Sequence, residues 1–74
     1  MCLGIPGRVV EVKGDKAVVD ISGIKREVDA LLVPDVKPGD FVIVHAGAII
    51  SKISREDYEE TIKYLRELAE VMYQ

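Results

Sequence analysis

The chain contains one cysteine and one histidine, and these two residues have the widest chemical range in it. Cys2 follows Met1, and removal of Met1 would place a thiol and an α-amino group on the same residue. Both groups are partly deprotonated near neutral pH, so either one is able to act as a nucleophile or as a metal ligand. The alternative is that Cys2 is a small apolar residue packed against a first strand.

His45 stands near the end of the apolar run 41–46, directly before Ala46 and Gly47. A lone histidine in such a run is often structural, with one ring nitrogen bonded to the backbone. The alternative is that His45 reaches Cys2. One thiolate and one imidazole make half of a tetrahedral site for iron, zinc or copper, so the other ligands would come from outside. An incomplete site of this kind suits a carrier that shares a metal with a partner and then releases it.

The apolar pattern that must position these residues changes from strand-like alternation to helical spacing near Ser54. The pattern predicts strands at residues 10–12, 17–21, 24–28, 41–46 and 48–53, a short apolar piece at 31–33, and a breaker-rich turn at 34–40. Gly4, Pro6 and Gly7 predict a defined turn that holds the thiol in place, and Gly47 predicts a bend or bulge. Five short antiparallel strands favour a small mainly β barrel, because closure removes exposed sheet edges.

A helix is predicted from Ser54 onward, where Ser54 and Asp57 match a capping box. The apolar stripe of this helix consists of Tyr58, Ile62, Leu65, Ala69 and Met72. We expect the stripe to dock on the barrel as a lid, while Tyr64, Leu68 and Val71 widen it into either more core contact or an edge left for a partner. The whole chain, 1–74, is thus predicted to be one domain, with the barrel in 1–53 and the packed helix in 54–74.

Composition narrows the class of partner. The 74 residues carry 10 basic and 13 acidic side chains, a net charge of -3, which argues against binding to a nucleic-acid backbone. One cysteine excludes an internal disulfide, and the sequence has neither a signal peptide pattern nor an apolar stretch long enough for a membrane span. We therefore expect a cytoplasmic protein whose partners are other proteins, without nucleic-acid or membrane binding.

Three segments together resemble the HypC/HupF family of nickel-iron hydrogenase maturation chaperones. They are residues 1–10 with the Met-Cys-x-x-x-Pro motif, residues 19–26, and the run 39–47 that contains His45. The resemblance covers nearly the whole chain and implies an OB-like five-stranded β-barrel with a C-terminal α-helix. It also implies a metallochaperone and scaffold, not an enzyme, for assembly of the Fe(CN)2CO centre of nickel-iron hydrogenase.

The resemblance implies that iron is held transiently, as Fe(CN)2CO shared with a partner, and that Cys2 and His45 are its ligands. The implied partners are HypD, the hydrogenase large-subunit precursor and other Hyp maturation proteins. From the sequence, we expect the partner surface to form around Cys2, Leu3, Ile5, Pro6 and Gly47, with the apolar residues excluding water from a shared iron.

Two other function classes remain open. Cys2 would be the nucleophile of an enzyme, but the sequence offers no third group to orient a base. An OB-type barrel often binds single-stranded nucleic acid, which requires stacking aromatics on its strands. Here Tyr58, Tyr64 and Tyr73 fall in the predicted helix, which leaves only Phe41 on a strand.

Overall fold

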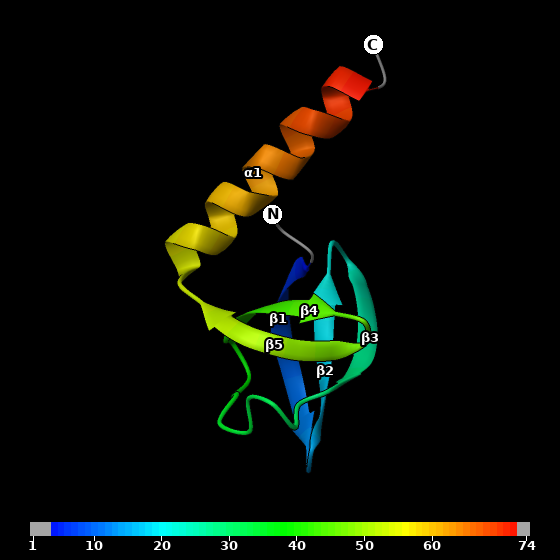
Figure 1. Cartoon of the computed structure of the whole chain (residues 1–74), viewed down its shortest axis with the longest axis vertical. Coiled ribbons are helices and arrows are strands. Elements are labelled where there is room, and N and C mark those ends of the chain that lie inside the picture. The colour runs from blue at the N-terminus through cyan, green and yellow to red at the C-terminus, as the bar shows by residue number, and fades with distance from the viewer. Residues whose placement is uncertain (1–3, 73–74) are drawn as a thin grey trace.

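The computed structural model describes residues 4–72, with side chains through residue 70, as five strands followed by one helix (Figure 1). The elements are β1 (Ile5–Lys13), β2 (Lys16–Ile21), β3 (Ile24–Asp29), β4 (Phe41–His45), β5 (Ala48–Ile53) and α1 (Arg55–Met72). The strands close into a barrel in the order β1-β2-β3-β5-β4. The predicted fold, a mainly β, OB-like five-stranded barrel with a C-terminal helix, is confirmed. One detail differs, because β3 and β5 pair in parallel, at Asp29 and Ala48.

Strand β1 begins earlier than the sequence pattern predicts. The turn expected at Gly4, Pro6 and Gly7 is wrong, since Pro6 and Gly7 both lie within β1. Residues 5–7 of this strand pair with β4, whereas pairing with β2 begins only at Arg8. A proline is tolerated where a strand has a neighbour on one side only. Gly7 is required for packing, because a Cβ there would overlap the Val19 side chain.

Two tight hairpin turns connect the strands that matter most for the site. Ser22 and Gly23 join β2 to β3, and Ala46 and Gly47 join β4 to β5; all four residues have positive φ. Two central residues with positive φ define a type I′ turn, which matches the right-handed twist of the flanking strands. Gly47 therefore marks a bend, as expected, and the bulge in β4–β5 pairing falls earlier, between Ile43 and Val44.

The barrel core is made of small branched side chains. Val9, Val19, Val42 and Ile49 are fully buried. The connection from β3 to β4 adds Ala30 and Val36 to this core, while Leu31 and Leu32 stand 62% and 70% exposed. The short apolar piece expected at 31–33 is therefore turn structure with its leucines directed outward.

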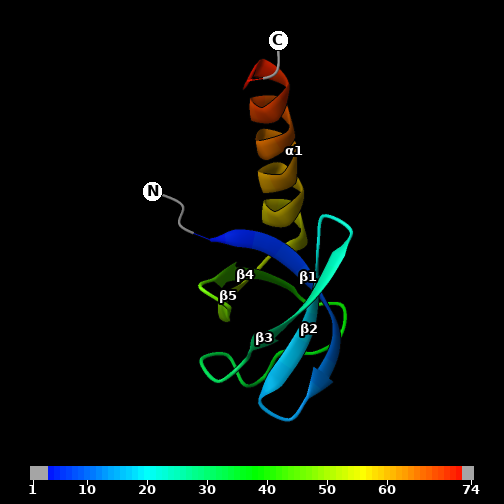
Figure 2. The same ribbon diagram turned by 90° about the vertical axis from the view of Figure 1, so that its right-hand side faces the viewer.

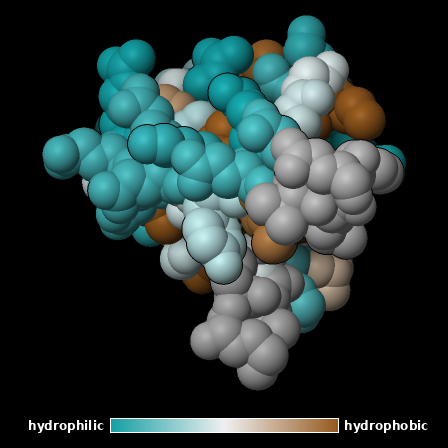
Figure 3. All heavy atoms as spheres, turned by 90° about the horizontal axis from the view of Figure 1, so that it is seen from above, coloured by the Kyte–Doolittle hydropathy of each residue, from teal (hydrophilic) through white to brown (hydrophobic). Residues whose placement is uncertain are grey.

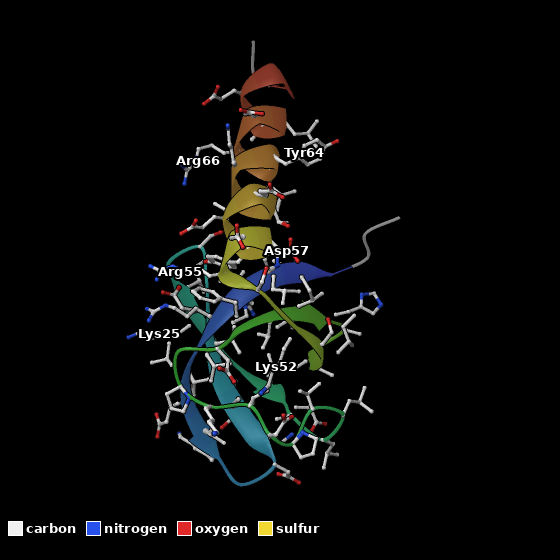
Figure 4. All side chains as sticks on the ribbon, turned by 90° about the vertical axis from the view of Figure 1, so that its left-hand side faces the viewer. Lys25, Lys52, Arg55, Asp57, Tyr64 and Arg66 are labelled. Atoms are coloured by element: carbon white, nitrogen blue, oxygen red, sulfur yellow. The ribbon has the colours of Figure 1, made fainter. Side chains whose placement is uncertain are left out.

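Lys52 of β5 fastens the connection between β3 and β4 to the barrel. Its Nζ lies 3.1 Å from a carboxylate oxygen of Asp35 and 3.3 Å from one of Asp40, and it also donates to the Asp35 carbonyl. Figure 4 shows Lys52 lying across this part of the chain. The hydrogen bond from Lys52 lowers the pKa of the Asp35 carboxyl, and the same contact raises the pKa of Lys52. A solvent-exposed network thus holds this connection from outside, while Ala30 and Val36 anchor it in the core.

Helix α1 starts as predicted but leaves the barrel after its first turns. Ser54 Oγ accepts a hydrogen bond from the Asp57 N–H at 3.0 Å, which is the N-cap expected from the sequence. The Tyr58 ring packs on Phe41 of β4, with ring centroids 4.5 Å apart, and Ile62 is partly buried one turn later. The rest of the helix projects beyond the barrel, giving the molecule extents of 43 × 21 × 20 Å (Figure 2).

The expected lid is therefore not what the structure has. Leu65, Leu68 and Tyr64 are 42%, 45% and 66% exposed, whereas Tyr58 and Ile62 are partly buried, so burial of the described part of the stripe is greatest near the start of α1. The physical reason is the direction of the chain: α1 follows β5 after one residue, Ser54, and this short link carries the helix outward. Tyr64 stands well above the strands in Figure 4. Seen from above, hydrophilic residues cover much of this end of the molecule and hydrophobic residues show as separate patches (Figure 3).

Candidate functional site

His45 is the last residue of β4 and the first corner of the hairpin turn to β5. Its side chain is exposed, and it pairs across the hairpin with Ala48. Between them Ala46 adopts φ 53°, a left-handed conformation that costs a residue with a Cβ about 1–2 kcal/mol. The Gly47 carbonyl accepts a hydrogen bond from the Asp29 N–H at 2.9 Å, which ties the turn to β3. The turn is thus fixed by the pairing of His45 with Ala48 and by its hydrogen bond to β3, and His45 at its edge is exposed to solvent.

The beginning of β1 lies beside this turn. Ile5 is the register partner of Val44 in the antiparallel β1–β4 ladder. Gly4, one residue earlier, is packed so closely that a Cβ would overlap the Ile43 side chain and stand 3.2 Å from the Val44 carbonyl oxygen. Glycine at position 4 therefore lets the chain enter the barrel directly along the end of β4.

The structure describes three residues of the predicted partner surface, Ile5, Pro6 and Gly47, and one of them is not exposed. Cys2 and Leu3 lie outside the described residues. Ile5 is 53% exposed and Gly47 is exposed, as expected for residues at a docking surface.

Pro6 is instead buried to below 2% exposure, on the face of β1 opposite to Ile5, because side chains alternate along a strand. This face carries Ile43, the register partner of Pro6 in β4, and it is the face on which Phe41 packs against Tyr58 of α1. Pro6 is therefore a buried packing residue and not part of an exposed surface.

An apolar groove that sequence reasoning missed runs next to this end of the barrel. Its volume is about 580 Å³, and it extends between β3, the start of β1 and the β4–β5 turn. The lining residues are Ile5, Ile21, Ser22, Ile24, Arg26, Glu27, Val28, Val44, Ala46 and Gly47. Ile24, which is 59% exposed, was visible in the sequence as an apolar residue directly after a turn, but only the closed barrel brings it opposite Ile5.

Residues 4–72 supply an incomplete set of metal donors. Within that range no three histidine, cysteine, aspartate or glutamate side chains form a group able to hold a metal ion. A metal ion bound at His45 would therefore need further donors from outside this range.

Phe41, the one aromatic residue on the described strands, is not available to stack on nucleic-acid bases. Phe41 is partly buried, and its ring is engaged by Tyr58 of α1. A surface for single-stranded nucleic acid needs exposed aromatic faces beside a basic groove. The groove described above contains Arg26 together with Glu27 and is otherwise mostly apolar.

Comparison with known proteins decides the family. The sequence profile of the HupF/HypC family matches residues 1–65, which include the start of β1, His45 and the first turns of α1. The chain belongs to the HupF/HypC family. The hydrogenase maturation factor HypC of Cupriavidus necator is 44% identical over 72 residues, covering 96% of this chain and 80% of the relative. HypC of Rhizobium leguminosarum bv. viciae is 43% identical, covering 93% of both chains. HypC of Escherichia coli K12 is 34% identical over 77 residues, covering 96% of this chain and 86% of its own.

Membership of the HupF/HypC family confirms the resemblance seen in the sequence. The matched range includes both the start of β1 and His45. Within the part of the chain that the structure describes, no helix is both long and apolar enough to cross a lipid bilayer. Helix α1 instead carries acidic and basic side chains along its length, among them the Arg55 and Glu59 pair at 3.4 Å.

Proposed function

We propose that this protein is a hydrogenase maturation factor that acts as a metallochaperone without turnover of its own. It binds iron as cargo, in the form of the Fe(CN)2CO fragment, and passes it to the large-subunit precursor of a nickel-iron hydrogenase. The observation that carries this proposal is the similarity, over nearly the whole chain, to proteins named hydrogenase maturation factor HypC. The exposed imidazole beside the start of β1 supports it, because it offers one nitrogen ligand suited to iron close to where β1 begins.

In this proposal Cys2 supplies a thiolate and His45 an imidazole nitrogen, and the remaining donors come from the partner. Thiolate and imidazole both bind iron well, while a two-donor set leaves the metal free to move to a better site. The hairpin turn at Ala46 and Gly47 fixes the direction of the imidazole, and exposed Ile5 gives a partner an apolar contact that excludes water.

We further propose that HypD, on which the iron fragment is assembled, and the large-subunit precursor use this same end of the barrel in turn. A carrier with one cargo site has to present that site to both donor and acceptor. Other Hyp maturation proteins are candidates for transient contact. The cytoplasm is the compartment we expect, because both partners are expected there.

Co-purification from the native host tests the function directly. The expected result is recovery of HypD or a hydrogenase precursor with this protein, with iron present in the complex and lost when Cys2 is replaced by alanine. Recovery of nucleic acid in place of these proteins, or turnover of a small substrate that depends on Cys2, would reject the proposal in favour of one of the other two classes.

A further inference from the structure

Strand β3 is paired along its whole length on one edge only. On that edge β2 pairs with all of β3, from Ile24 opposite Ile21 to Asp29 opposite Lys16. On the other edge, within residues 4–72, β5 meets β3 at Asp29 alone. Figure 1 shows the β2–β3 hairpin continuing past the point where β5 leaves it. The barrel therefore has a split beside the outer part of β3.

The alternating direction of the backbone along β3 shows which N–H and C=O groups face this split. Successive residues of a strand direct their N–H and C=O groups to opposite edges. The Asp29 N–H points toward β5, since it donates to the Gly47 carbonyl at 2.9 Å. Glu27 and Lys25 are in phase with Asp29, so their N–H and C=O groups face the same edge. Among the described residues no strand lies there to pair with them.

The apolar groove lies under this row of backbone groups. Side chains on β3 alternate, and Val28, which is in phase with Arg26 and Ile24, points into the core. The side chains of Arg26 and Ile24 therefore lie on the groove side of β3. The opposite wall of the groove contains Ile5 and Val44. A chain laid along β3 would find backbone partners at its edge and apolar surface beneath alternate side chains.

We propose that an extended segment of the hydrogenase large-subunit precursor, the client of this maturation factor, binds to this groove. The segment adds a strand that pairs with Lys25 and Glu27 of β3. This inference deepens the proposed function and rests on it. An unpaired strand edge calls for another extended backbone, because a helix uses its own N–H and C=O groups internally. The apolar groove then selects segments with apolar side chains at every second position.

The shape of the groove favours a single extended chain over a second copy of this protein. The open edge is recessed between the β2–β3 hairpin and the β4–β5 turn, whose Ser22 and Gly47 both line the groove. Two folded barrels would have to bring two recessed edges to the 4.7–4.9 Å spacing of paired strands, whereas one flexible chain enters without obstruction.

The precursor on which a maturation factor acts is a suitable partner for the open edge of β3. A protein that is still receiving its metal has not completed its fold, so it offers extended segments that the finished protein no longer exposes. The groove also adjoins the proposed cargo site, because Ile5 and Gly47 border both. A segment held on β3 would keep the acceptor polypeptide next to His45 while the cargo moves.

Hydrogen exchange in the complex with the hydrogenase large-subunit precursor tests the pairing. This protein is labelled with 15N, exchanged in the complex, and read residue by residue by NMR after quenching. We expect the amides of Lys25 and Glu27 to exchange at least tenfold more slowly than in the free protein. The amides of Arg26 and Val28 are the internal reference, since they face β2 and should change little.

Two matched variants extend the test to affinity. Ile24→Thr removes apolar surface from the groove and should weaken precursor binding about tenfold or more, while Ile50→Thr makes the same change on β5 outside the groove and should not. Exchange of core amides in the free variants verifies that both fold.

Each outcome has a distinct meaning. A complex that forms with Lys25 and Glu27 exchanging as in the free protein, and with Ile24→Thr binding normally, overturns strand addition and leaves the proposed function standing. Protection of these amides that depends on the concentration of this protein alone assigns the edge to a second copy and also overturns the inference. No complex with the precursor rejects the proposed function, and the client on β3 with it.

Discussion

Ile5 lies opposite Val44 in the antiparallel ladder between β1 and β4, one residue before His45. This register places the start of β1 at the end of the barrel where His45 lies, although Ile5 and His45 are 40 positions apart in the sequence. The proposal that Cys2 and His45 share a cargo depends on this pairing, because Cys2 precedes Ile5 by only three residues.

The first prediction separates folding from cargo binding at Cys2. Cys2→Ala should change the free energy of unfolding by no more than about 0.5 kcal/mol, because a residue near the chain end contributes few contacts. Iron in the precursor complex should fall below a tenth of the wild-type amount. Thermal unfolding and metal analysis of the purified complex measure the two effects. A large loss of stability with iron retained would show that Cys2 is a packing residue.

The second prediction concerns His45, whose side chain is exposed at the turn. His45→Ala should reduce iron per complex several-fold while the Kd for the partner changes less than threefold, because the imidazole supplies a ligand and little contact area. Ile5→Asp is the complementary variant: it places a charge at an apolar contact and should weaken docking itself. Equal losses of docking and iron in both variants would contradict this division of roles.

Much of the barrel was predictable from local signals. Alternating valines and isoleucines, the Gly14-Asp15 and Ser22-Gly23 turns and the Ser54 cap each act over a few residues, and all appear where the pattern predicts. The N-terminal turn failed because the role of Pro6 depends on which neighbours β1 has. The sequence shows a proline between two glycines and does not show that residues 5–7 pair with β4 alone.

The course of the helix and the groove required the three-dimensional structure. An amphipathic stripe predicts that a face is apolar, but the angle at which β5 leads into α1 decides whether that face reaches the barrel. Leu65 and Leu68 stay exposed for this reason. The groove depends on the closure of β1 against β4, which brings Ile5 near Ile24. The identity of the site residues, His45 included, remains a prediction based on the sequence.

The third prediction tests the strained corner beside His45. Ala46 has φ 53°, so Ala46→Gly should raise the free energy of unfolding by about 1 kcal/mol, the left-handed cost less the extra chain entropy of glycine. Gly47→Ala should lower it by about 1 kcal/mol or more. No atom lies within 4 Å of a Cβ added at Gly47, so the loss would reflect backbone conformation alone. Urea unfolding of the two variants gives both values.

The fourth prediction uses two tyrosines of α1 as a matched pair. Tyr58→Ala removes the ring packed on Phe41 and should cost about 2 kcal/mol, lowering Tm by several degrees. Tyr64→Ala removes the same side chain two turns later, where it is 66% exposed, and should shift Tm by less than about 2 degrees. Similar losses in both variants would mean that the helix folds back on the barrel in solution.

The fifth prediction concerns the pH dependence of the Lys52 network. The Asp35 pKa is lowered from its usual 3.8 and the Lys52 pKa is raised from 10.5 by the bond between them. The contribution of Asp35 is therefore present above its unfolded pKa and lost as pH falls through the lower folded value. That of Lys52 is present below its unfolded pKa and lost as pH rises through the higher folded value.

Lys52→Met should accordingly be less stable than the wild type by a constant amount between about pH 5 and pH 9. The difference should shrink in stronger acid and in stronger base, and it should also shrink in 1 M salt, because the charges are exposed. Lys37→Met is the control, since Lys37 lies in the same connection but makes no ion pair within 4.0 Å among the described residues. A deficit of Lys52→Met that persists unchanged at pH 2 would show that its aliphatic stem, rather than its charge, fastens the loop.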